Sequence, residues 1–180
     1  MISASVTDAV TVPNRITLAR IVFIPFFIYF LLSAQSLFSH RLIAAALFLA
    51  LSLSDALDGY LARKLNQSSA FGALIDPLAD KLLVYSAFIV FVEIGKLWAI
   101  FALLIIARDF IVMGVRVWAA RNGRIIAASG IGKWKTVSQM SAIFFMILNL
   151  PFWKILFLIS LVLCLYSGWE YFKQVDIGEI

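Results

Sequence analysis

The chain has 180 residues, of which 63% are hydrophobic and 14% charged, with a formal net charge of +5 and a mean hydropathy of +1.01. This composition excludes the soluble globular class, and the length is that of one domain. Cys164 is the one cysteine, which excludes an internal disulfide and a thiolate metal cage. We therefore expect an integral membrane protein.

Six apolar segments approach the ~20 residues that an α-helix needs to cross a ~30 Å hydrocarbon core. Residues 1–14 carry no positively charged n-region, so we expect a short interfacial segment there and not a cleaved signal peptide. The predicted fold is one all-α membrane domain over 1–180 with six transmembrane helices. We place these helices at residues 16–32, 41–65, 72–94, 97–120, 132–150 and 152–172.

The lysines and arginines predict the orientation, because the membrane face richer in them is normally cytoplasmic. Six spans then put both termini in the cytoplasm. The richer side holds Arg15, Arg20, Arg63, Lys64, Arg116, Arg121, Arg124, Lys133, Lys135 and Lys173, and the poorer side holds Arg41, Lys96 and Lys154.

Four aspartates lie in residues 55–80, which read DxxDGxxAR, eight residues, then GxxxDxxxD. Asp55 and Asp58 share one helix face, and Asp76 and Asp80 share another. A charged side chain at the centre of a membrane helix costs roughly 2.5–3.5 kcal/mol on insertion scales. Neighbouring carboxylates also repel, whereas divalent cations that prefer hard oxygen ligands reverse both penalties. The two faces therefore predict a shared metal site on the cytoplasmic side.

Two glycines and an arginine accompany the carboxylates. Gly59 and Gly72 lack a Cβ, which lets backbone or ligand approach closely, and Arg63 suits a phosphate group. Because a proline follows Asp76, the alternative is that Asp76 caps a helix beginning there. That alternative does not account for Asp80, one turn further on.

Basic residues in the later segments suit an anionic ligand. Arg108 and Asp109 lie near the middle of the fourth segment, as an internal ion pair that holds helices together or as a site where Arg108 binds anionic substrate. Lys133 and Lys135 enter the fifth segment, where a helix N-terminus favours phosphate. For Lys133 the alternative is ordinary positive charge on the cytoplasmic side. The sixth segment is interpreted as scaffold.

The fixed positions of the acidic motif resemble the signature of the CDP-alcohol phosphatidyltransferases. Flanking sequences are similar to the bacterial phosphatidylglycerophosphate synthase branch of that family, which often has Arg-Glu where this chain has Arg-Asp at 108–109. The motif positions are Asp55, Asp58, Gly59, Ala62, Arg63, Gly72, Asp76 and Asp80, and the flanking sequences are PNRITLARI, IDPLADK and GKWKTVSQM.

The resemblance implies transfer of a phosphatidyl group from CDP-diacylglycerol to sn-glycerol 3-phosphate, giving phosphatidylglycerophosphate and CMP. It also implies two Mg²⁺ or Mn²⁺ ions, a homodimer among membrane lipids, and a site on the cytoplasmic face of the bacterial inner membrane. No nucleic-acid partner is expected.

Residue roles follow from the same resemblance. Asp55, Asp58 and Asp76 are expected to bind metal, with Asp80 as both ligand and general base. The expected CDP-lipid contacts are Gly59, Ala62, Arg63, Gly72, Asn14 and Thr17, and the expected acceptor-phosphate contacts are Arg20, Arg108, Arg116, Lys133 and Lys135.

Other functions stay open at this point. The same chemistry can use inositol phosphate, serine or phosphatidylglycerol as acceptor, although the basic residues favour a phosphorylated one. Intramembrane carboxylates also occur as proton or metal relays in transporters, but such relays rarely need an arginine and two glycines at fixed spacing. A purely structural membrane subunit is the third alternative, which predicts that changing Asp80 affects folding or assembly alone.

Overall fold

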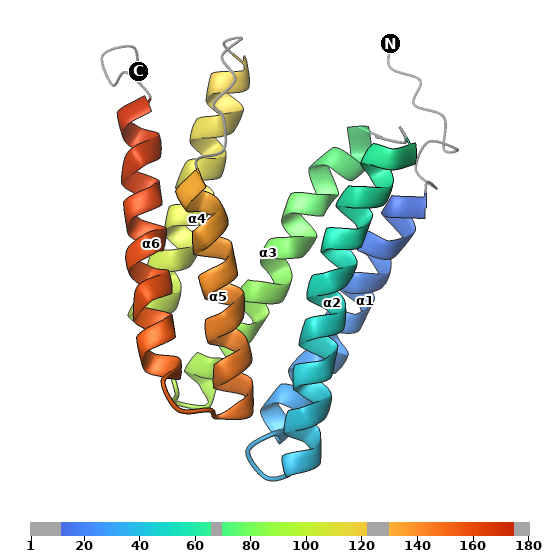
Figure 1. The fold of residues 1–180 in the computed structure, drawn as a ribbon, viewed down its shortest axis with the longest axis vertical. Coiled ribbons are helices and arrows are strands. Elements are labelled where there is room, and N and C mark those ends of the chain that lie inside the picture. The colour runs from blue at the N-terminus through green and yellow to red at the C-terminus, as the bar shows by residue number, and fades with distance from the viewer. Residues whose placement is uncertain (1–11, 66–69, 122–129, 175–180) are drawn as a thin grey trace. The chain divides into compact units, whose positions relative to one another are not determined.

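The computed structural model describes the backbone of residues 12–65, 70–121 and 130–174, and most side chains outside 12–17 and 55–80. All regular structure in these ranges is helical, which confirms the predicted all-α fold and its six helices (Figure 1). The helices are α1 (Val12–Ser33), α2 (Phe38–Leu65), α3 (Ala70–Glu93), α4 (Ala99–Arg121), α5 (Gly130–Leu148) and α6 (Trp153–Gln174).

Several helices begin earlier than their apolar runs. Helix α1 includes Pro13, which the first turn tolerates because the amide hydrogen there has no helical partner. Helix α3 begins at Ala70 and continues through Asp76 and Pro77. The alternative in which Asp76 caps the start of a helix is therefore wrong.

The chain forms two compact units, Met1–Val90 and Phe91–Ile180. The predicted single domain over 1–180 stays a prediction. In the first unit α1 packs along α2, and the rings of Phe27 and Phe48 lie 5.9 Å apart between them.

In the second unit α6 packs against both α5 and α4. A short turn joins α5 to α6, with Asn149 at φ 55° and Phe152 at φ 69°, the left-handed region that non-glycine residues rarely adopt. The Lys96 ammonium donates to the Met146 carbonyl at 3.3 Å and to Asn149 Oδ1 at 3.2 Å. A cation at a helix C-terminus stabilises the exposed carbonyls.

Large apolar side chains are exposed along the helices, as in Phe26 of α1, Phe110 of α4 and Leu158 of α6. By length and composition, Trp153–Tyr171 of α6 is the one span among the described residues able to cross a membrane. Leu18–Ser33 and Phe38–Ser54 are shorter apolar helices. The six membrane crossings, and the cytoplasmic termini, stay predictions.

Candidate active site

The acidic motif lies on two helices. Asp55 and Asp58 belong to α2, and Asp76 and Asp80 belong to α3, so each pair has the helical spacing that the sequence predicts. Their side chains lie outside the described residues, as do those of Asn14, Thr17, Gly59, Ala62, Arg63 and Gly72. Among the side chains that the structure does describe, no three His, Cys, Asp or Glu residues lie close enough together to hold a metal ion. The metal site stays a prediction from sequence.

Arg20 lies beside the start of this motif. Its side chain on α1 is only 2% exposed, and its Nε donates to Ser54 Oγ at 3.4 Å. Ser54 directly precedes Asp55 on α2, and its hydroxyl donates to the Leu51 carbonyl at 2.8 Å. Arginine is rarely buried unless it is paired. The structure therefore places this cation in the α1–α2 packing, at the level where the acidic motif begins.

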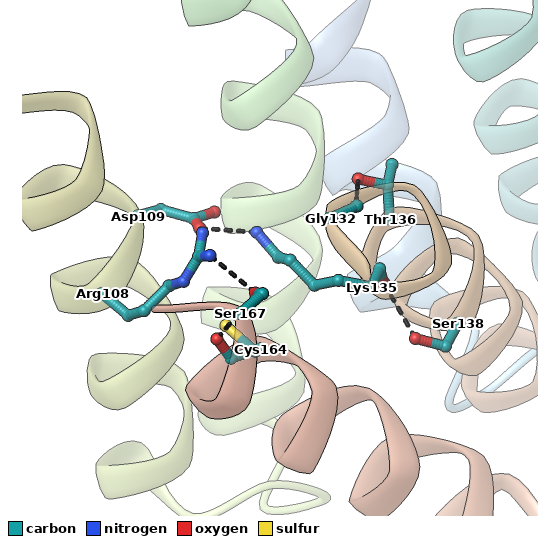
Figure 2. Close-up of polar contacts among 8 residues, drawn as sticks. All are labelled: Arg108, Asp109, Gly132, Lys135, Thr136, Ser138, Cys164 and Ser167. Atoms are coloured by element: carbon teal, nitrogen blue, oxygen red, sulfur yellow. Dashed lines mark hydrogen bonds and ion pairs between the residues drawn. The ribbon is translucent and has the colours of Figure 1, made fainter. Parts of the chain in front are cut away.

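A buried ionic cluster joins α4 to α5. Arg108 Nη1 lies 2.8 Å from Asp109 Oδ1, and Lys135 Nζ lies 2.5 Å from the same oxygen (Figure 2). The Asp109 and Lys135 side chains are 4% and 7% exposed, and that of Arg108 is 12% exposed. The two basic residues, 27 positions apart in the chain, thus meet at one carboxylate.

Helix α6 completes this cluster. Arg108 Nη2 donates to Ser167 Oγ at 2.6 Å, and Ser167 Oγ donates to the Cys164 carbonyl at 3.0 Å. The Tyr171 ring lies 5.8 Å from Cζ of Arg108 and 5.5 Å from Cζ of Arg116. Both arginines are within the distance of a cation–π contact.

Other predicted phosphate contacts lie elsewhere. Lys133 is exposed while Lys135 is buried, because residues two apart on a helix point to different sides. The Thr136 hydroxyl donates to the Gly132 carbonyl at 3.2 Å, within its own helix. Arg116 is exposed, and among the described residues it meets the cluster through the Tyr171 ring alone.

Ser167, Gly168 and Tyr171 contact this cluster, although the apolar sequence of their helix predicts only a scaffold. The available signal was the Ser-Gly pair at 167–168 in an apolar helix, since small residues mark close helix packing in membranes.

Comparison with known proteins identifies the fold family. A sequence profile of the CDP-alcohol phosphatidyltransferases matches residues 10–166. The chain belongs to this family. The matched range includes the acidic motif and the Arg108–Asp109–Lys135 cluster, and it confirms the resemblance noted from the sequence.

Individual members of the CDP-alcohol phosphatidyltransferase family are similar along most of their length. The Bacillus subtilis protein named CDP-diacylglycerol–glycerol-3-phosphate 3-phosphatidyltransferase is 39% identical, over 90% of this chain and 93% of its own. Proteins of the same name from Escherichia coli K12 and Shigella flexneri serotype 5b are each 37% identical, over 89% of this chain and 92% of their own.

In this phosphatidyltransferase-family chain, the cluster can serve both structure and binding. The predicted ion pair between Arg108 and Asp109 is present. A guanidinium has five N–H donors, and Arg108 uses two of them in its hydrogen bonds to Asp109 and Ser167. Arginine binds phosphate through such donors in a planar, directional array. The predicted acceptor-binding role of Arg108 and Lys135 is thus compatible with the pairing and stays a prediction.

Proposed function

We propose that this chain is a CDP-diacylglycerol–glycerol-3-phosphate 3-phosphatidyltransferase of phosphatidylglycerol biosynthesis. The supporting observation is 39% identity to the Bacillus subtilis enzyme of that name over 90% of the chain. The acidic motif is complete at its eight defined positions, which adds the residues that the reaction needs.

The proposed reaction is a displacement at phosphorus. A hydroxyl oxygen of glycerol 3-phosphate attacks the phosphorus that carries the diacylglycerol, the new O–P bond forms, and the P–O bond to CMP breaks. CMP leaves with the bonding electron pair. Asp80 takes the proton of the attacking hydroxyl, as a general base must lie within reach of the proton it accepts.

Divalent ions are the proposed cofactor. The donor set fits them, since Asp55, Asp58, Asp76 and Asp80 provide hard carboxylate oxygens on two helices. Bound Mg²⁺ or Mn²⁺ would offset the charge that develops on the diphosphate oxygens. Other residues of the motif bind the CDP-lipid: Gly59 and Gly72 leave room for the nucleotide, and Arg63 binds the diphosphate.

Arg108 and Lys135 are the proposed ligands of the acceptor phosphate. Each is mostly buried, and both converge on Asp109, which keeps the two cationic groups in fixed positions. A phosphorylated acceptor brings a dianion that serine or a simple alcohol lacks, and this favours glycerol 3-phosphate over serine.

We also propose that the protein lies in the bacterial inner membrane, with its active site and both termini on the cytoplasmic side. We further propose that it forms a homodimer. The exposed apolar side chains and the span Trp153–Tyr171 support the membrane location. The distribution of lysine and arginine supports the orientation. Single cysteines at Lys173 and at Ser36, both exposed, in a Cys164→Ser background test the orientation. We expect an impermeant thiol reagent on intact cells to label only the Ser36 position, and labelling at Lys173 would reverse the topology. Crosslinking in native membranes tests the dimer.

The reaction is tested with the purified protein, CDP-diacylglycerol and Mg²⁺. We expect CMP release that depends on glycerol 3-phosphate. Parallel reactions contain serine, inositol phosphate or phosphatidylglycerol in place of glycerol 3-phosphate. Release with one of these and none with glycerol 3-phosphate would reject the proposed acceptor, and no release with any would reject the reaction class.

A further inference from the structure

We propose that α6 sets acceptor recognition by positioning Arg108 through Ser167 and Gly168. This rests on the proposed function, in which Arg108 binds the acceptor phosphate. Neither α6 residue is proposed to touch substrate; both act through the arginine.

The hydrogen bonds of Ser167 orient it toward Arg108. Its hydroxyl has one hydrogen, which goes to the Cys164 carbonyl at 3.0 Å, so the lone pairs of its oxygen accept from Arg108 Nη2 at 2.6 Å. Ser167 is fully buried, and Figure 2 shows it beneath the end of the Arg108 side chain. The position of Nη2 is therefore fixed from α6.

Gly168 lets the arginine lie against α6. A Cβ built at Gly168 would lie 3.0 Å from Arg108 Cγ and 3.1 Å from its Nε. Contacts this short force the arginine stem to move by a few tenths of an ångström. Nε is buried and has no hydrogen-bond partner in the part of the chain that the structure describes, so no hydrogen bond of its own holds it in place.

These contacts leave a defined set of donors for a ligand. Nη1 binds Asp109, Nη2 binds Ser167, and Nε faces Gly168, so one N–H on each terminal nitrogen is left without a partner among the residues that the structure describes. Two N–H groups held in this way suit two oxygens of one phosphate. A shift of the arginine stem would misalign both.

The test compares two pairs of matched variants. Gly168→Ala is paired with Gly114→Ala, because a Cβ at Gly114 meets nothing within 4 Å. Ser167→Ala is paired with Ser160→Ala, because Ser160 is an equally buried α6 serine that donates to a carbonyl three residues earlier, at 2.7 Å. The measured quantities are kcat and KM for each substrate, with thermal unfolding as the check on folding.

We expect Gly168→Ala and Ser167→Ala to raise KM for glycerol 3-phosphate about tenfold, as small displacements of positioning groups do. KM for CDP-diacylglycerol should change less than about twofold, since the donor site is not involved. The Gly114 and Ser160 variants should match the wild type in both constants.

A double-variant cycle gives a second reading. If Ser167 acts through Arg108, then Ser167→Ala should have little further effect on acceptor KM in an Arg108→Lys background. Equal KM values within each matched pair, or full additivity in the cycle, would overturn the positioning role in an enzyme that uses glycerol 3-phosphate. A wild type that releases no CMP with glycerol 3-phosphate would overturn the proposed function itself, and this inference with it.

Discussion

The Lys135 ammonium of α5 and the Asp109 carboxylate of α4 lie 2.5 Å apart in the second unit. Asp109 also binds the guanidinium beside it in sequence, at 2.8 Å. One buried carboxylate thus pairs with two cationic groups that are themselves mostly buried. Removing one partner of a buried ion pair leaves the other charge uncompensated.

We predict that Asp109→Asn lowers the free energy of unfolding by about 3–5 kcal/mol, the cost of breaking a buried pair. KM for glycerol 3-phosphate should rise as well, because both cationic side chains lose their anchor. Asp109→Glu, which keeps the charge, should recover most of the loss. Thermal unfolding in detergent and steady-state kinetics measure the two effects, with exposed Glu93→Gln as the control. If Asp109→Asn leaves the free energy of unfolding unchanged, the cluster makes no net contribution to stability.

Asp80→Asn should lower kcat by about 10²–10⁴-fold, the usual contribution of a general base. The helical circular dichroism spectrum and the unfolding midpoint should stay close to those of the wild type. Loss of folding with no active fraction would support the structural-subunit alternative, and a rate near that of the wild type would remove Asp80 from the mechanism.

Chelation with EDTA should abolish CMP release, and added Mg²⁺ or Mn²⁺ should restore it, because the carboxylates are proposed to work through bound cations. Electron paramagnetic resonance of Mn²⁺ gives a reading independent of activity. Bound Mn²⁺ should be lost in Asp58→Asn and retained in Glu93→Gln. Mn²⁺ binding that survives Asp58→Asn, or activity that survives chelation, would contradict the metal site.

Lys96→Met should lower the free energy of unfolding by about 1–2 kcal/mol, as expected when a charged hydrogen bond at a helix C-terminus is lost. Lys154→Met is the matched control, since Lys154 is exposed and contacts only the Trp153 ring in the described structure, at 5.7 Å. Thermal unfolding compares them. Equal midpoints would show that the bonds to Met146 and Asn149 add no stability.

The hydrophobic runs predict where the helices lie. Each run is longer than a typical β-strand of a soluble protein, and short polar segments separate one run from the next. Helix starts were less predictable. Pro13 precedes the first apolar run and yet lies inside α1, and Phe38 begins α2 three residues before the predicted start at 41. Apolar periodicity does not report on first turns, whose stability depends on local backbone partners.

The acidic motif was visible in the sequence because its members lie close together in the chain. The support of Arg108 was not, since Ser167 is 59 residues away and neutral. Similarly, the sequence shows Arg41 only as a charge that flanks an apolar segment. In the structure its Nη2 donates to the Ala34 carbonyl at 3.3 Å, near the end of α1. Tertiary contacts of this kind follow from helix packing, which a single sequence does not specify.

The tight turn between α5 and α6 bears on how the protein is made. Phe152 and Asn149 hold strained backbone angles there, at a cost of order 1–3 kcal/mol each, and such angles persist only when the flanking helices are already packed together. The two helices and the turn between them should therefore assemble together as one helical hairpin. A long flexible insert between residues 149 and 152 should slow that assembly, even if the finished protein works normally.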